Sequence, residues 1–88
     1  MGQVAMTFKL MPEDITTDLN AMKELIKKAL PANVKLNGFV EEPIAFGLKA
    51  LMVQVVLDDR QGGGDDVERI LGEVAGVSSV NLENMGLL

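Results

Sequence analysis

The sequence predicts an α+β fold in which a four-stranded antiparallel sheet carries two helices on one face. Three observations support this prediction. Residues 1–11 alternate between the two faces of a strand, and residues 48–57 read as a nearly continuous apolar strand. Two other segments repeat apolar residues at helical spacing. Turns rich in proline and glycine separate six segments in the order strand, helix, strand, strand, helix, strand.

The first and third strands have the strongest apolar character, so they are expected at the centre of the sheet. Period-two spacing places their inward residues on one face. These residues are Val4, Met6, Phe8 and Leu10 in the first strand and Leu51, Val53, Val55 and Leu57 in the third. Pro12 ends the first strand because proline cannot donate to a ladder. Met52 is expected on the opposite face of the sheet.

The first helix is expected between the first strand and Pro31, which stops it. Its apolar stripe is Leu19, Met22, Ile26, Ala29 and Leu30. Its start is marked by Thr16 or Thr17 as the cap and by the acidic residues Asp18 and Glu24, and its end by Lys27 and Lys28. Glu24 and Lys28 form a favourable i,i+4 pair.

The second strand is expected at residues 33–42, and its turn can be placed in two ways. Asn37-Gly38 is the strongest two-residue hairpin signal in the chain, but it would leave flanking strands of only about four residues, near the lower limit. The preferred turn is therefore the segment from Glu42 to Gly47, which a proline and a glycine bound. Asn37-Gly38 then predicts a bulge.

The C-terminal part of the chain predicts a loop, a helix and a last strand. Residues 58–64 are polar and rich in glycine. Asp65, Asp66 and Glu68 suit the positive end of the following helix, and Gly76 is a plausible stop. The apolar stripe of this helix is Val67, Ile70, Leu71 and Val74. A last strand is expected from Val77 to about Met85, with Val80 and Leu82 facing inward.

Two right-handed crossovers connect these elements into a ferredoxin-like βαββαβ sandwich. With 88 residues the chain is expected to form one domain over residues 1–88. The face of the sheet without helices is left to water or to a partner. Because many functions share this fold, function must be argued from particular residues.

The composition excludes several classes of function. The chain has no Cys and no His, so it lacks thiol nucleophiles, catalytic triads and the ordinary zinc ligands. A net charge of -5 argues against binding to a phosphate backbone. The first dozen residues carry no basic start with a long apolar run, and no apolar stretch approaches the ~20 residues of a membrane span. We therefore expect a cytoplasmic protein that binds neither nucleic acid nor membrane.

The remaining candidate motifs favour structural roles. The few hydroxyl side chains have no adjacent base. The acidic pairs, Glu13-Asp14, Glu41-Glu42, Asp58-Asp59 and Asp65-Asp66, match no calcium loop, and neighbours on a strand point to opposite faces, so we interpret them as solvated charge. Gly62-Gly63-Gly64 precedes a helix but lacks the lysine of a phosphate loop. No metal or cofactor is expected, and the chain is not expected to be an enzyme.

The turn from Pro43 to Lys49 is the most informative segment. Strand-connecting loops usually carry polar residues, yet this one carries Ile44 and Phe46. Phe46 can fold over an edge of its own core, since single exposed apolar residues are common. Alternatively, Phe46 is an anchor that enters a pocket of a partner, with Lys49 adding a positive charge beside it.

Three stretches of the sequence resemble the archaeal type of the elongation factor 1-beta family. They are residues 42–51 (EPIAFGLKAL), which are the most specific, residues 11–13 (MPE) and residues 73–80 (EVAGVSSV). The resemblance extends over essentially the whole chain. It implies a ferredoxin-like exchange domain that restores the GTP form of elongation factor 1-alpha, the GTPase that would be the partner.

The resemblance also implies which residues contact that GTPase. Phe46 corresponds to the aromatic residue of a Gly-aromatic-Gly loop that wedges against the nucleotide-binding domain, although Ala45 replaces the preceding glycine. Leu87 stands where eukaryotic relatives have a penultimate lysine that disturbs the magnesium site. The residues implied as partner-binding are Pro43, Ile44, Ala45, Phe46, Gly47, Lys49, Leu87 and Leu88. A different hypothesis for the same fold is a small-molecule-binding regulatory domain, which would need an apolar cavity with convergent polar groups.

Overall fold

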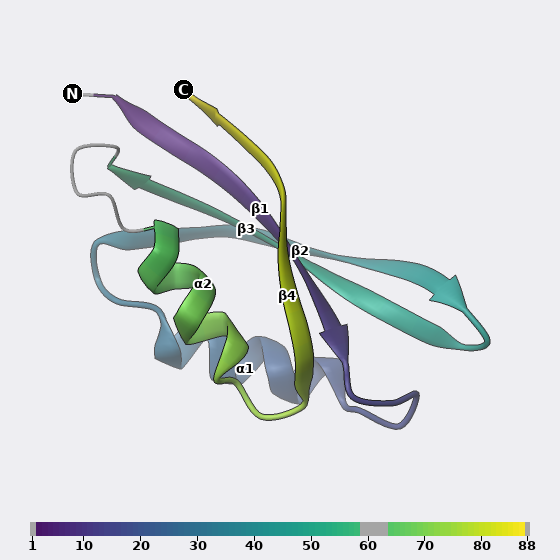
Figure 1. Cartoon of the computed structure of the whole chain (residues 1–88). Coiled ribbons are helices and arrows are strands. Elements are labelled where there is room, and N and C mark those ends of the chain that lie inside the picture. The colour runs from purple at the N-terminus through teal and green to yellow at the C-terminus, as the bar shows by residue number, and fades with distance from the viewer. Residues whose placement is uncertain (1, 59–63, 88) are drawn as a thin grey trace.

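The computed structural model describes residues 2–58 and 64–87. Six elements follow one another in the predicted order (Figure 1). They are β1 (Gln3–Pro12), α1 (Leu19–Ala29), β2 (Val34–Ala45), β3 (Leu48–Asp58), α2 (Gly64–Gly72) and β4 (Val77–Leu87). The strands form one antiparallel sheet in the order β2-β3-β1-β4. The ferredoxin-like α+β fold and the central positions of the first and third strands are thus confirmed.

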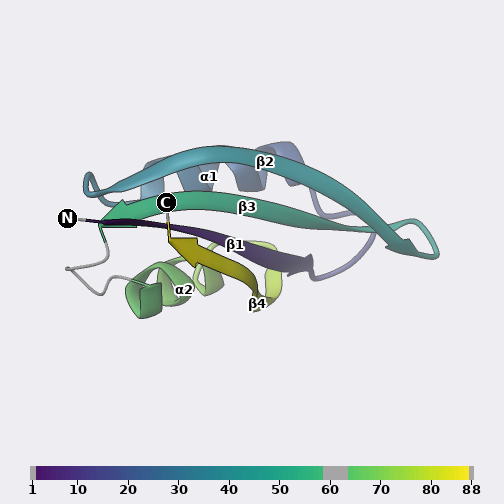
Figure 2. The same ribbon diagram turned by 90° about the horizontal axis from the view of Figure 1, so that it is seen from above.

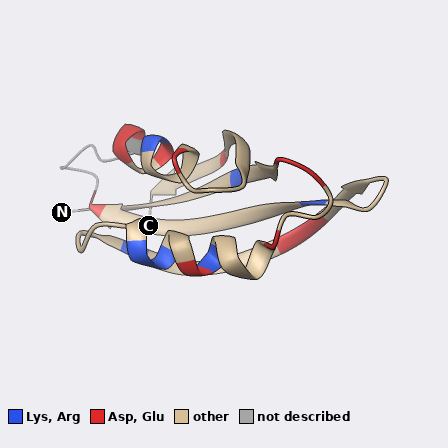
Figure 3. Cartoon of the chain, turned by 90° about the horizontal axis from the view of Figure 1, so that it is seen from below, with Lys and Arg blue, Asp and Glu red and all other residues tan. Residues whose placement is uncertain are grey.

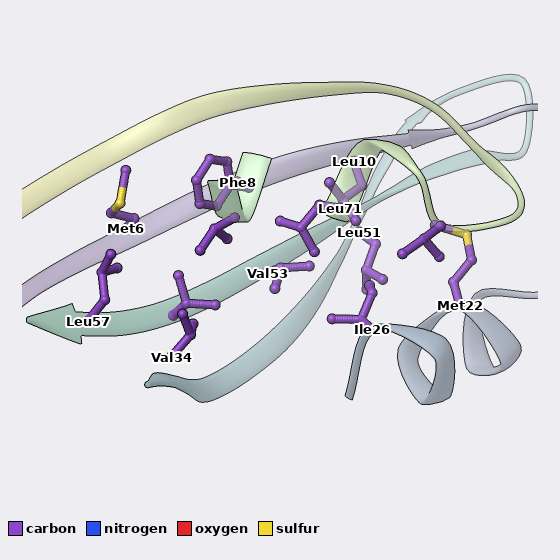
Figure 4. Close-up of a cluster of buried hydrophobic side chains, with 13 residues drawn as sticks. Met6, Phe8, Leu10, Met22, Ile26, Val34, Leu51, Val53, Leu57 and Leu71 are labelled. Carbon is purple, nitrogen blue, oxygen red and sulfur yellow. The ribbon is translucent and has the colours of Figure 1, made fainter. Parts of the chain in front are cut away.

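Both helices cover the same face of the sheet (Figure 2), and the buried core lies between the two layers. The predicted inward residues of β1 and β3 all contribute to this face, and Leu10, Leu51, Val53 and Val55 are completely buried. Met22 and Ile26 from α1 and Leu71 from α2 close the core from the other side (Figure 4), and Val67 of α2 belongs to the same buried cluster. Within the described residues no polar or charged side chain is buried.

The cap of α1 differs from the prediction. Its N-cap is Asp18, whose carboxylate accepts hydrogen bonds from the backbone N–H groups of Asn20 and Ala21 at 3.0 and 3.2 Å. Thr16 instead donates its backbone N–H and its hydroxyl to Asp14. The capping prediction was therefore wrong, because the carboxylate of Asp14 already engages Thr16 in a local turn ahead of the helix.

Three further details of α1 differ from the prediction. Of the two acidic residues predicted at the start of the helix, Asp18 is the N-cap, as expected in position, whereas Glu24 lies in the second turn. Glu24 pairs with Lys27 at 3.9 Å rather than with Lys28. Ala29, predicted in the apolar stripe, is exposed at the last position of the helix, and Pro31 follows shortly after, as expected.

The α2–β4 turn holds Gly76 against the β1–α1 loop. Gly76 has a φ of +93°, and a Cβ placed there would lie 3.0 Å from Cγ2 of Thr17. Its carbonyl accepts a hydrogen bond of 2.9 Å from the backbone N–H of Glu13. The helix ends at Gly72, four residues before Gly76, so the predicted stop is a feature of this turn and not of the helix end.

The second and fourth strands are longer than predicted. β2 continues to Ala45, which leaves a turn of only two residues, Phe46 and Gly47, in place of the six-residue turn. The predicted bulge is confirmed, because the β2–β3 register shifts between Leu36 and Gly38. β4 continues to Leu87, and Leu82 is 43% exposed although it lies opposite Phe8 on the helix-covered face, because β4 forms an edge of the sheet.

Candidate functional site

The β2–β3 hairpin extends beyond the rest of the sheet and away from the helices (Figure 1). The pairing of β1 with β3 ends at Leu10 and Leu51, whereas β2 and β3 continue to pair up to Ala45 and Leu48. We call residues 42–49 the ribbon. An isolated two-stranded hairpin is only marginally stable, so the ribbon depends on its attachment to the body of the domain.

The tip of the ribbon places an aromatic side chain in water. Phe46 and Gly47 form a two-residue turn, and both have positive φ, +52° and +82° respectively. This is the pattern of a type I′ turn, which normally takes Asn-Gly or Gly-Gly. A left-handed backbone costs a residue with a side chain roughly 1–2 kcal/mol. Phe46 is also 98% exposed, so its ring gains no burial to offset this strain.

Other residues of the ribbon add to the exposed tip. Ile44 is 40% exposed and lies at an irregularity of the β2–β3 register, between Pro43 and Ala45. Lys49 is exposed on the returning strand, opposite Pro43. The structure thus brings the six implied ribbon residues together, and it rules out the alternative in which the ring of Phe46 covers its own core.

A polar hollow of about 330 Å³ separates the ribbon from the β1–α1 loop. The ribbon contributes Gly47 and Lys49 to its lining, and the loop contributes Asp14 and Ile15, the latter 66% exposed. Hydrogen bonds from Thr16 lower the pKa of Asp14 below its ordinary value. The loop is therefore held by its own contacts and does not pack tightly on the ribbon.

Two ion pairs hold the root of the ribbon, one on each face of the sheet. Glu41 accepts a hydrogen bond of 2.9 Å from Nζ of Lys23 in α1, and this bond, followed by the charge of Lys23, lowers the pKa of Glu41. Glu42 lies 3.8 Å from Nζ of Lys9 in β1. Figure 3 shows the acidic residues of β2 where the ribbon leaves the body and the basic residues along α1.

Glu41 and Glu42 lie on opposite faces of β2, as predicted, but each forms an ion pair and is not simply solvated charge. These ion pairs were missed because the partners, Lys23 and Lys9, are distant in sequence. The alternation of side chains along the strand could have predicted these pairs. Two adjacent carboxylates point to opposite faces, so one can reach a cation in the helix layer and the other a cation on a neighbouring strand.

The C-terminal residues lie at the other end of the sheet. Leu87 pairs with Val4, which also pairs with Leu57 near the end of β3. Leu57 lies nine positions after Leu48 along β3, so roughly 30 Å lies between Leu87 and the base of the tip turn. Leu87 is 76% exposed, and Leu88 lies outside the described residues. The structure therefore does not bring the C-terminus together with Phe46.

Other kinds of site find little support in the described part of the chain. Residues 2–58 and 64–87 contain no cluster of three acidic residues that could hold a metal ion, and no helix among them is long and apolar enough to cross a membrane. The glycine-rich loop candidate, Gly62 and Gly63, lies outside this range. On the open face of the sheet, away from the helices, Val40 and Met52 line a hollow of about 320 Å³. No buried polar side chain of the described residues converges on it, as small-molecule recognition would require.

Comparisons with known proteins find relatives that cover nearly all of the chain. Residues 5–88 match the family of the EF-1 guanine nucleotide exchange domain. The chain is 48% identical over 83 residues to elongation factor 1-beta of Methanosarcina barkeri, with 93% of each chain covered. It is 41% identical over 88 residues to elongation factor 1-beta of Archaeoglobus fulgidus, with both chains covered completely.

A solved structure supports the fold alone. The C-terminal domain of the MgtC protein from Mycobacterium tuberculosis superimposes with a TM-score of 0.54, covering 100% of this chain and 88% of that domain. The two sequences are only 11% identical. Since the fold is shared by proteins with many functions, this similarity carries no functional argument.

Proposed function

The chain belongs to the family of the EF-1 guanine nucleotide exchange domain, and from this premise we propose that it promotes exchange of GDP for GTP on elongation factor 1-alpha by wedging Phe46 against the nucleotide-binding domain of that GTPase. The whole of residues 1–88 acts as one exchange domain in the cytoplasm. Its partner is a protein, and its role requires neither nucleic acid nor membrane.

The observation that carries this proposal is the state of Phe46. The ring is 98% exposed, and its backbone has a φ of +52°, which costs free energy without any compensating contact in the free protein. Strain of this kind is typically retained where it serves function. Aromatic side chains are also the usual anchors of protein interfaces. A protruding phenylalanine in a strained turn is therefore suited to enter a pocket of a partner.

Exchange by this route needs no catalytic side chain. A GTPase holds its nucleotide through phosphate contacts and Mg²⁺. A protein that binds more tightly to the conformation in which these contacts are broken shifts the GTPase toward that conformation, by an amount equal to its differential affinity. This mechanism fits a chain that has no His and no Cys.

The C-terminus points to a departure from the eukaryotic relatives that the sequence resembles. Leu87 cannot displace Mg²⁺ by charge, and it lies at the end of the sheet opposite the ribbon. Nucleotide release then depends on the Phe46 wedge and on a basic group at the tip, for which Lys49 is the candidate. Lys49 forms no ion pair within the described residues.

The test is the release of a fluorescent GDP analogue from elongation factor 1-alpha, measured with and without the purified protein. The parent protein should accelerate release, and Phe46→Ala should reduce this acceleration at least severalfold while leaving the circular dichroism spectrum unchanged. Val40→Thr is the matched control, because Val40 is an exposed apolar residue of β2 outside the ribbon. Full activity of Phe46→Ala, or equal losses in both variants, would contradict the wedge.

A separate outcome addresses the small-molecule alternative. If the parent protein leaves nucleotide release unchanged at saturating concentrations, exchange is not its function. Binding of a small molecule in the hollow on the open face, lined by Val40 and Met52, would then be the next hypothesis to examine.

A further inference from the structure

The angle of the ribbon relative to the body is not fixed by packing. The ribbon leaves the sheet beyond the pair Leu10 and Leu51, so neither of its strands pairs with β1 there. On the helix-covered side, the hollow of about 330 Å³ lies between the ribbon and the β1–α1 loop. A two-stranded ribbon beside an unfilled hollow can swing into it unless other contacts prevent the movement.

Lys23 supplies such a contact. It projects from α1, which is anchored in the core by Met22 and Ile26, both essentially unexposed. Its ammonium group donates to Glu41 at 2.9 Å and lies 5.9 Å from the centre of the Phe39 ring. One side chain of the helix layer thus binds two residues of β2, Phe39 within the sheet and Glu41 at the root of the ribbon.

We propose that Lys23 is a positioning residue for nucleotide exchange. It connects α1 to the root of the ribbon and thereby sets where Phe46 meets the GTPase. This inference rests on the proposed function, because it assumes that Phe46 is the anchor. Lys23 lies at the far end of the ribbon from Phe46 and acts through Glu41. It is not assigned a contact with the nucleotide or with the catalytic centre of the partner.

The second ion pair supports the same part of the ribbon from the open face. Lys9 in β1 and Glu42 in β2 lie on either side of β3, with Nζ and Oε1 3.8 Å apart. This pair is longer and more exposed than the pair of Lys23 with Glu41, so it is expected to contribute less. Because partly exposed ion pairs are weak, loss of Lys23 should slow exchange by about two- to fivefold and not abolish it.

The first test compares exchange rates of charge variants. Lys23→Glu and Glu41→Lys should each reduce accelerated GDP release by about two- to fivefold. The double variant, which restores opposite charges in reversed order, should be faster than either single variant. The double variant need not recover the full exchange rate of the parent protein. Lys49 lies close enough to influence residue 41, and the reversed pair no longer places a cation near the ring of Phe39.

The matched control is Lys28→Glu. Lys28 is exposed on the same helix and has no ion pair within the described residues, and its substitution changes the net charge by the same amount as Lys23→Glu. Exchange by this variant should stay within the error of the parent. If Lys28→Glu slows exchange as much as Lys23→Glu, or if the double variant is slower than both single variants, the positioning role is refuted.

The second test observes the ribbon directly. The chain contains no Trp, so Phe46→Trp introduces a single fluorophore at the tip. Adding Lys23→Glu should increase the amplitude of its nanosecond depolarisation in time-resolved anisotropy, whereas adding Lys28→Glu should not. An unchanged decay would overturn the inference even if exchange were slower. The two proposals can fail separately. If Phe46→Ala loses exchange activity while Lys23→Glu retains it, only the positioning role of Lys23 is refuted. If Phe46→Ala retains exchange activity, the proposed wedge itself is refuted.

Discussion

Replacing Phe46 with asparagine should make the protein more stable and less active at the same time. Asn-Gly is the preferred pair for a turn in which both central residues have positive φ, as Phe46 and Gly47 do. The left-handed backbone costs a residue such as Phe roughly 1–2 kcal/mol, and asparagine offsets part of this cost by local hydrogen bonding. The ring is 98% exposed, so its removal sacrifices almost no packing within the fold.

We therefore expect Phe46→Asn to increase the free energy of unfolding by about 1 kcal/mol. For a domain of this size that corresponds to a rise in Tm of about 4–8 °C. If Phe46 is an anchor of the interface, its loss costs at least about 2 kcal/mol of binding to the exchange-competent state, or roughly 30-fold in accelerated GDP release.

Circular dichroism during thermal unfolding gives the Tm of the variant. A GDP-release assay on the same preparation gives its exchange activity. A variant that melts at or below the temperature of the parent protein would refute the argument that the tip is strained. A variant that is stabilised but fully active would show that the strained ring is not the anchor. Phe46→Ala separates the two effects, because it removes the ring but offers a poorer turn residue than asparagine.

Three further predictions concern the supporting structure. Gly76→Ala should destabilise the fold by about 1–2 kcal/mol, because φ is +93° and the added Cβ would lie 3.0 Å from Thr17. Chemical denaturation measures this change, and an unchanged midpoint would contradict the close approach. Asp18→Ala should lower the free energy of unfolding by about 1 kcal/mol, because α1 loses its cap. An unchanged stability would indicate that Thr16 or Thr17 caps the helix instead. Hydrogen bonds lower the pKa of Asp14 and of Glu41 in the folded state. The two carboxylates therefore stabilise the folded protein at pH values above the ordinary carboxyl pKa of about 4, and this stabilisation is lost as the pH falls through the lowered pKa values. The double variant Asp14→Asn/Glu41→Gln should therefore lose less stability than the parent between about pH 5 and pH 3 in acid titrations, and an identical titration would contradict this assignment.

The sequence was sufficient for the layers of the fold because its core residues follow simple periods. Val4, Met6, Phe8 and Leu10 repeat every second position, and the same is true of the inward residues of β3. Burial in the structure reproduces these faces because a strand must place alternate side chains on opposite sides. The bulge at Asn37-Gly38 was predictable for a similar local reason, since glycine interrupts a strand without a turn.

The boundaries of the ribbon were not predictable from local preference. Pro43 and Gly47 indicate a turn over the whole segment, yet Pro43 pairs with Lys49 within the hairpin. Proline is tolerated there because β2 is an edge strand, and this depends on the strand order of the complete sheet. The backbone of Phe46 was also unpredictable, since a bulky residue with positive φ contradicts its intrinsic preference.

The implied contact site was predictable only in part. The six ribbon residues are adjacent in sequence, so any fold would keep them together. Leu87 is grouped with them only through the family resemblance, and the antiparallel path of β4 carries it to the far end of the sheet. The support from Lys23 and Lys9 depends on tertiary distances, which one sequence does not reveal.

The two edges of the sheet have different consequences for assembly. The pairings of both edge strands contain two register irregularities, but only β2 also contains a proline, Pro43, and β4 pairs with no further strand in the described part of the chain. Free backbone N–H and C=O groups along such an edge can accept an additional strand from another polypeptide. A strand added along β4 would lie on the side of the sheet away from β2 and would therefore leave the hairpin tip uncovered.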